Sequence, residues 1–320
     1  MSRSILPLDP FDPWQGTVVR APELAEPGYW AGCPGVLHDG ERFWMTYRER
    51  RPRGVAPERG WRCAVAVSED GTSFSDVWSV HKDELGSSSM ERFALTRTGD
   101  GGLRLYLSYV DPADNRWRID AVDAAEPSAL DVRERRSVLT AASTGTEGVK
   151  DPYVLQAGPV TYLFASYAAA RPGLAADAHE TADIYNVGAT THPTGLATST
   201  DGTTFAWHGE VLGVGGGWNR YQARLNSVVP VGGLFVGFFD GSASHEENYE
   251  ERCGLAVSAD LFSWRRLSDA APWVVTAEGT GSVRYVDAVV VDGSWWVYYE
   301  LSRPDGAHEL RVLRADRPPA

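Results

Sequence analysis

The sequence has few cysteines and no long apolar run, and each shortage excludes a class of protein. The three cysteines, Cys33, Cys63 and Cys253, show no metal-ligand spacing and favour a reducing compartment. No apolar stretch approaches the length that spans a bilayer, and residues 1–16 contain no apolar signal core. We therefore expect a cytoplasmic protein that has no membrane partner.

Positive charge is also scarce. The 30 basic residues face 43 acidic ones, so the formal net charge is −13. This balance disfavours a nucleic-acid partner, although a local group of basic residues can still bind a small anion. The pairs His179–Glu180 and His245–Glu246 lack the spacing of a zinc site, so we expect neither a metal ion nor another cofactor. The sequence leaves the oligomeric state open.

Helical periodicity is hard to find anywhere in the chain, whereas strand–turn–strand patterns recur. Each pattern has a short apolar or β-branched strand, a glycine-containing turn and a second strand that is rich in aromatic residues. Five such patterns occupy residues 35–49, 94–110, 153–167, 227–241 and 288–302. They predict an all-β protein built from hairpins.

The hairpins belong to a longer repeat. The related segments SEDGTSF, STDGTTF and SADLFSW begin at Ser68, Ser199 and Ser258, and their spacing fits a repeat of roughly 64 residues. Five repeats of four antiparallel strands predict a five-bladed β-propeller that occupies residues 1–320 as a single domain. The fifth repeat lacks an obvious fourth strand, and we expect residues 16–22 to supply it and close the ring.

A propeller brings distant residues together, because the innermost strand of every blade begins beside the central axis. Aligning the five hairpins places the following residues there: Cys33; Glu91 and Arg92; Lys150 and Asp151; Arg224 and Asn226; and Arg284, Tyr285 and Asp287. Buried cations must be neutralised. Either they pair with neighbouring carboxylates and carbonyls that plug the channel, or they hold an anionic ligand by forked hydrogen bonds.

Two short motifs carry a resemblance to a known family. Lys150-Asp151-Pro152 at the third inner strand and SADLFSW in the fourth repeat, together with the five-blade pattern, resemble the superfamily of glycoside hydrolase families 43, 32 and 68. The resemblance implies a five-bladed propeller that hydrolyses or transfers arabinose, xylose, fructose or related sugars. It also implies a pocket with three carboxylates, including a general acid whose pKa is raised by its surroundings.

Only one of those three carboxylates stands at its expected position. Asp151 matches the family aspartate that tunes the acid and orients the substrate. Cys33 stands where the family has its aspartate base or nucleophile, and Arg224 and Asn226 stand where it has its glutamate acid. The resemblance therefore implies a rearranged acid–base set.

Several residues are candidates to complete that set. Glu91 and Glu147 are candidate relocated carboxylates, although a glutamate in a connector is usually a surface residue. Tyr285 is a candidate proton donor if Arg284 lowers its pKa, but a buried tyrosine usually belongs to the core. Cys33 would need a lowered pKa and a paired base to act as a nucleophile, and is otherwise inert packing.

Loops and tryptophans provide further candidate contacts. Three long loops, residues 47–62, 168–193 and 240–254, are expected on the same face, where they either set selectivity or form a salt-bridged lid. Tryptophans in connectors stack on sugar rings or cap the edge of a blade. Those in connectors or loops are Trp14, Trp30, Trp61 and Trp218, of which we assign Trp218 to the substrate site.

The sequence thus predicts a glycoside hydrolase-like enzyme. Its substrate is expected to be a small sugar or glycoside, either neutral or anionic. The predicted catalytic residues are Asp151, Glu147, Glu91 and Tyr285. The predicted substrate-binding residues are Arg92, Lys150, Arg224, Asn226, Arg284, Asp287, Trp218 and Cys33. Two alternatives remain: a propeller that catalyses a cyclisation, elimination or isomerisation of an acidic biosynthetic intermediate, and a non-catalytic sugar-binding propeller.

Overall fold

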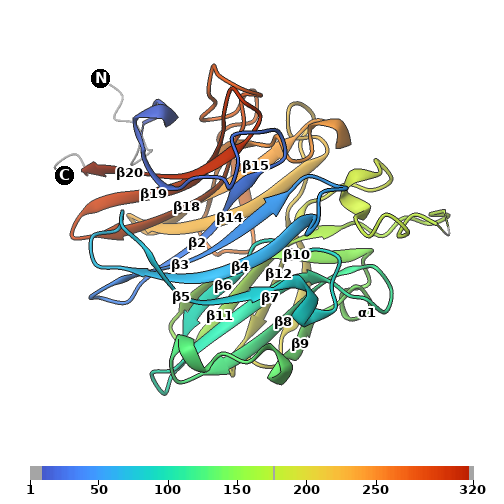
Figure 1. Cartoon of the computed structure of the whole chain (residues 1–320), viewed down its shortest axis with the longest axis horizontal. Helices are drawn as coiled ribbons and strands as arrows, with labels where there is room; N and C mark the ends of the chain where they lie inside the picture. Colours follow the sequence, from blue (N-terminus) through green and yellow to red (C-terminus); the bar gives the residue numbers. More distant parts are fainter. Residues whose placement is uncertain (1–8, 176, 317–320) are drawn as a thin grey trace.

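The computed structural model describes residues 9–175 and 177–316, and strands make up about half of it (Figure 1). Apart from one four-residue α-helix, α1 (Ala141–Thr144), the helices are short 3-10 turns in the connections. These are η1 (Pro13–Gln15), η2 (Lys82–Leu85), η3 (Pro127–Ala129), η4 (Val132–Glu134), η5 (Ile184–Asn186) and η6 (His245–Glu247). None of the described helices has the length and apolar character needed to cross a membrane.

The antiparallel pairs fall into five groups of four strands. Group one is β2 (Trp30–His38), β3 (Phe43–Arg51), β4 (Arg59–Ser68) and β5 (Ser75–His81). Group two is β6 (Ala94–Arg97), β7 (Leu103–Val110), β8 (Trp117–Ala124) and β9 (Arg136–Leu139). Group three is β10 (Gly148–Ala157), β11 (Val160–Ala168), β12 (Thr194–Ser199) and β13 (Ala206–Leu212).

The last two groups complete the series. Group four is β14 (Gln222–Val231), β15 (Leu234–Ser242), β16 (Arg252–Ser258) and β17 (Trp264–Arg266). Group five is β18 (Val283–Val291), β19 (Ser294–Ser302) and β20 (His308–Asp316), and its fourth strand is β1 (Thr17–Arg20). The strand expected in residues 16–22 is therefore present, and it pairs with β20 as predicted.

The nearly all-β class is confirmed, but the strands form three sheets of twelve, four and four strands rather than five separate ones. Groups four, five and one merge into the large sheet through two single parallel bridges, Arg252 to Val283 and Trp30 to His308. Each bridge joins the third strand of one group, β16 or β20, to the inner strand of the next group, β18 or β2.

The apolar side chains pack between consecutive groups. Separate core clusters lie between groups one and two, two and three, three and four, and four and five, and a further cluster joins group five to group one. The groups are therefore arranged in a ring, as in a β-propeller. Residues 36–38, 95–97, 153–156, 228–231 and 288–290, one segment from each inner strand, line a single apolar cavity of about 510 Å³ at one end of the axis.

Leu310 tests the closure of this ring, because it is fully buried on β20, where that strand pairs with β1 and β19. Leu310→Ala is expected to lower the free energy of unfolding by about 2–5 kcal/mol, since it leaves a cavity at the seam. Val290→Ala, on an exposed position of β18, is the control and is expected to change it by less than about 1 kcal/mol. Urea unfolding measures both, and equal losses would contradict this account of the seam.

Candidate axial site

The inner strands bend where they pass the axis. A register shift interrupts the pairing of β2, β10, β14 and β18 with the strand that follows each of them. In three of these bulges a residue other than glycine has a positive φ: Cys33 (54°), Asp151 (56°) and Tyr285 (51°). Such conformations are unfavourable for ordinary side chains and are often found at functional sites. Here the bulges turn these three side chains towards the axis.

Asp151 lies at the centre of the residues that the sequence predicted to converge. Its Oδ2 atom accepts a hydrogen bond from Arg224 Nη1 at 2.9 Å and from the Tyr285 hydroxyl at 3.4 Å, and lies 3.8 Å from Lys150 Nζ. Its Oδ1 atom accepts from the backbone N–H of Arg92 at 3.3 Å. The carboxyl has no exposed surface. The structure therefore brings residues from groups two to five around one aspartate.

A second ring of polar residues, which the sequence analysis missed, lies on the second strand of each group. These residues are Arg48, Ser108, Ser166, Asp240 and Glu300. Each of four is the register partner of an inner-strand residue: Gly32 and Arg48, Lys150 and Ser166, Arg224 and Asp240, Arg284 and Glu300. Each of the four follows its partner by sixteen residues, and this constant offset is the sequence signal that identifies the ring.

Asp240 and Glu300 neutralise the arginines opposite them. Arg224 Nη2 lies 2.5 Å from Asp240 Oδ2, and Arg284 Nη2 lies 2.6 Å from Glu300 Oε1. Glu251, immediately before β16, pairs with Arg284 at 2.6 Å and lies 3.6 Å from Arg224. The two arginines are therefore not free to bind an external anion in this structure.

Burial and ion pairing shift the pKa values of these carboxyl groups in opposite directions. Burial alone would raise the pKa of Glu251, but Arg284 and Arg224 more than offset this and lower it to about 2. Burial would likewise raise the pKa of Glu300, and Arg284, His308 and Arg48 together hold it well below its usual range. For Asp240, burial outweighs Arg224 and raises the pKa. Asp240 also has one oxygen, Oδ1, without a hydrogen-bond partner among the described residues.

Three predicted substrate-binding residues form a plug below Asp151. The Arg92 guanidinium donates to Asp287 Oδ2 and to the backbone oxygen of Asn226, both at 2.5 Å. Asp287 also accepts a hydrogen bond from the backbone N–H of Val36 at 2.9 Å. Burial raises the pKa of Asp287, and this effect outweighs the lowering by Arg92 and Val36. These groups separate the charged part of the axis from the apolar cavity. Of the two expectations for the buried cations, Arg92 therefore fits pairing with a carboxylate and a carbonyl, not the binding of an external anion.

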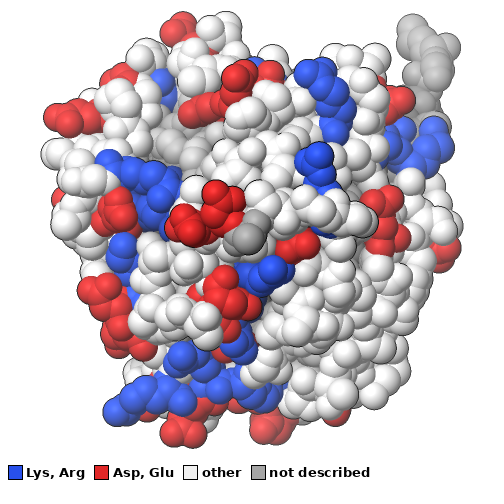
Figure 2. Space-filling model, turned by 90° about the vertical axis from the view of Figure 1, so that its right-hand side faces the viewer, with Lys and Arg blue, Asp and Glu red and all other residues white. Residues whose placement is uncertain are grey.

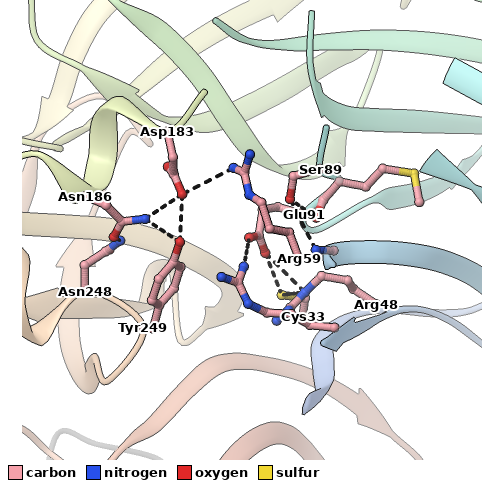
Figure 3. Close-up of polar contacts among 12 residues, drawn as sticks. Cys33, Arg48, Arg59, Ser89, Glu91, Asp183, Asn186, Asn248 and Tyr249 are labelled. Atoms are coloured by element: carbon pink, nitrogen blue, oxygen red, sulfur yellow. Dashed lines mark hydrogen bonds and ion pairs between the residues drawn. The ribbon is translucent and has the colours of Figure 1, made fainter. Parts of the chain in front are cut away.

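Cys33 and Glu91 lie close together, beside Arg48 (Figure 3). Glu91 Oε2 lies 3.1 Å from Arg48 Nε and 3.6 Å from Cys33 Sγ, and Glu91 Oε1 lies 3.3 Å from Arg50 Nη1. Burial raises the pKa of the Cys33 thiol, and this outweighs the effect of Arg48. Cys33 is therefore a protonated thiol and is not an activated nucleophile.

Three expectations about individual residues need correction. Trp218 packs on Phe239 with ring centroids 5.6 Å apart and bonds the Ser268 oxygen, so it lies off the axis in group four. Glu147 pairs with Arg116 and His179 near the surface. Burial raises the pKa of Tyr285 well above 10 despite Arg224, so no nearby arginine makes it an acid. Trp218 and Glu147 were placed by their neighbourhood along the backbone, which does not show where a connector turns, whereas Tyr285 lies at the axis as expected and only its pKa differs.

The buried charged residues at and around the axis are here called the axial cluster; of those that are described, ten form one network of ion pairs, and Arg59–Asp183 and Arg92–Asp287 are two separate pairs. Among the residues that the structure describes, seven buried cations pair with seven buried carboxylates. The cations are Arg48, Arg50, Arg59, Arg92, Lys150, Arg224 and Arg284, and the carboxylates are Glu91, Asp151, Asp183, Asp240, Glu251, Asp287 and Glu300. Their formal charges cancel when all are ionised. The cluster can stay buried because of this balance.

No family model and no curated protein matches this sequence. Solved structures do match the fold. A structure described as a complex of BT0996 with RGII matches with a TM-score of 0.70 and 12% identity, over 95% of this protein and 93% of that one. A thermostable family-43 glycoside hydrolase matches with a TM-score of 0.63 and 13% identity, over 91% of this protein and 95% of that one. The protein has a β-propeller fold like that of the family-43 glycoside hydrolase.

The same fold extends beyond hydrolases. The β-1,2-mannobiose phosphorylase from Listeria innocua, in complex with β-1,2-mannobiose, matches with a TM-score of 0.63 and 12% identity, over 89% of each protein. At these identities the likeness shows a shared fold. The activity must be argued from the axial cluster itself.

Glu251 makes part of the stability depend on pH. Its pKa is lowered on folding, so its contribution is present above the ordinary value of 4.5 and is lost as the pH falls towards about 2. Glu251→Gln is expected to cost roughly 3 kcal/mol at pH 7, because it leaves Arg284 incompletely neutralised. It is also expected to flatten the loss of stability below pH 4.5.

Chemical unfolding at several pH values measures both effects. Glu246→Gln, at an exposed position in the same loop, is the matched control and is expected to behave as the unmodified protein does. A Glu251→Gln variant whose stability falls as steeply with acid as that of the unmodified protein would show that Glu251 is not the responsible group.

Proposed function

We propose that the protein is a glycoside hydrolase-like enzyme that acts on a small sugar or glycoside at the axial cluster, and that the five strand groups are five propeller blades. The main support for this proposal is that the Arg224 guanidinium pairs with two buried carboxyl groups, those of Asp151 and Asp240, whose environments differ. Asp151 accepts hydrogen bonds through both oxygens, whereas Asp240 keeps an oxygen without a partner and has a raised pKa. Pairs of this kind divide acid and base roles.

In this proposal Asp240 replaces the missing glutamate acid. Arg224 occupies the position on β14 where the resemblance placed that acid, and Asp240 is its register partner on β15. The acid has therefore moved by one strand while remaining at the axis. Asp240 gives its proton to the leaving oxygen of the glycoside, and Asp151 takes a proton from the attacking water.

We further propose that the substrate is uncharged rather than anionic. The predicted anion-binding residues Arg92, Arg224 and Arg284 already pair with carboxyl groups, so their guanidinium groups are already occupied. On the molecular face that carries the β11–β12 loop, acidic and basic side chains lie side by side around the centre of the view, and basic side chains gather along its lower edge (Figure 2). An anion would gain little from a field in which both charges are mixed.

One observation favours the second candidate, a non-hydrolytic propeller enzyme. The residue at the expected base position, Cys33, is a thiol whose pKa burial raises. A reaction that needs only an acid and an orienting carboxylate, such as an isomerisation or elimination, would use Asp240 and Asp151 without that base. This candidate shares the site and differs in the fate of the substrate.

A panel of chromogenic arabinofuranosides, xylosides, fructosides and galactosides tests the proposal, with uronides as the charged comparison. We expect turnover of a neutral member that falls as the pH rises through the raised pKa of Asp240, because the acid must be protonated. Asp151→Asn and Asp240→Asn are each expected to lower kcat/KM by about a hundredfold or more.

Asp120→Asn is the matched control, since Asp120 is also buried and paired but lies on β8, away from the axis. It is expected to retain activity. Binding of a sugar without turnover would identify a sugar-binding protein instead. Turnover that survives both Asp151→Asn and Asp240→Asn would place the chemistry elsewhere.

A further inference from the structure

The axial cluster is closed off from solvent. Cys33, Asp151 and Glu300 have no exposed surface, and Arg224 and Tyr285 retain 1% and 2% of theirs. A sugar ring cannot touch these groups unless part of the cover moves. The proposed function therefore requires an element of the cover that opens.

A continuous set of side-chain contacts, here called the column, leads from the surface to the buried Cys33 thiol. Tyr249, half-buried in the loop between β15 and β16, has its ring centroid 4.3 Å from the Arg50 guanidinium and 5.4 Å from the ring of Trp30. Arg50 lies 3.3 Å from Glu91, and Glu91 lies 3.6 Å from Cys33. Tyr249 is thus the outermost member of a continuous set of contacts that ends at the axis.

A clasp of hydrogen bonds holds Tyr249 over this column (Figure 3). The Tyr249 hydroxyl donates to Asp183 Oδ2 at 2.7 Å, and the side-chain amide of Asn186 donates to the same oxygen at 2.5 Å. Asn248 contacts Asn186. These four residues, the Asp183 clasp, tie the β15–β16 loop to η5 and its N-terminal side.

The two halves of the clasp differ in how firmly they are held. Asp183 is buried and also contacts Trp117 Nε1 at 3.2 Å and Arg59 Nη2 at 3.4 Å. Burial would raise its pKa, but Arg59 and Lys150 more than offset this and lower the pKa to about 2, so it accepts hydrogen bonds at neutral pH. Tyr249, by contrast, has a φ of 83°, which a tyrosine adopts only when contacts hold it there.

We propose that Tyr249 is the gate of the axial site and that its hydrogen bond to Asp183 is the latch. When the latch breaks, the loop can relax to an ordinary backbone conformation, and Tyr249 leaves Arg50 and Trp30 exposed. The path to Cys33 and Asp151 then opens. The inference deepens the proposed function, because it takes the axial cluster to be the site that a substrate reaches, but the opening itself needs no substrate.

Cys33 is a built-in reporter of this opening. In a Cys63→Ala/Cys253→Ala background, Cys33 is the single thiol, and its reaction with a disulfide reagent measures how often the axis is exposed. Tyr249→Phe removes the latch hydroxyl and keeps the ring, so the reaction is expected to be about tenfold faster. Tyr249→Ala removes the cover itself and is expected to be at least as fast. Burial raises the pKa of the Cys33 thiol in the closed structure, so opening favours the reaction both by exposing the thiol and by relieving this effect.

Tyr298→Phe is the matched control. Its hydroxyl also donates a buried hydrogen bond, to Gly71 O at 2.8 Å, in the core between groups five and one. If labelling needed global unfolding, this variant would accelerate it as much as Tyr249→Phe does, and the gate would be rejected. Unchanged labelling in both Tyr249 variants would also reject it. Acceleration confined to the Tyr249 variants supports it.

The same variants separate the gate from the proposed function. Faster labelling of Tyr249→Phe without turnover of any glycoside by any variant would keep the gate and reject the hydrolase. Turnover by the unmodified protein with Cys33 labelling unaffected by the Tyr249 substitutions would keep the hydrolase and reject the gate.

Discussion

Charge neutralisation at Arg224 is the constraint on which the axial site depends. Its guanidinium lies 2.9 Å from Asp151 and 2.5 Å from Asp240, and the three side chains come from three different strands. A single unpaired ion in this position would cost several kcal/mol. The pairing therefore requires groups three and four to meet at a defined distance, and the ring of strand groups sets that distance.

The same constraint explains why this axis differs from an ordinary carboxylate pocket. Arg224 stands where the family resemblance placed an acid, and a carboxyl group appears on the partner strand instead. With the cation on the inner strand and the carboxyl on its register partner, both groups remain at the axis. The pKa of Asp240 is nevertheless raised, because its burial outweighs the effect of Arg224. A site of this kind is stable and has little attraction for a further charge.

Sequence reasoning found the inner residues because glycine-containing turns align the hairpins reliably. It missed Asp240 and Glu300, since they look like ordinary polar ends of aromatic-rich strands until the register places each opposite an arginine. It also assigned Trp218 and Glu147 to the site, because proximity to an inner strand along the backbone was the only guide available. The path of a connector depends on how it packs against other parts of the protein, and the sequence of a single strand does not show that packing.

The sequence by itself determined the strand periodicity, the repeat, the strand at residues 16–22 and the convergence of Arg92, Lys150, Arg224 and Tyr285 on Asp151. These features follow from local alternation and turn chemistry, which act over a few residues. Only the tertiary structure decided which cation meets which carboxylate, that the cluster is neutral as a whole, and that Tyr249 covers it. Ion pairing and burial depend on distances between segments far apart in the sequence, and those distances exist only after the ring has closed.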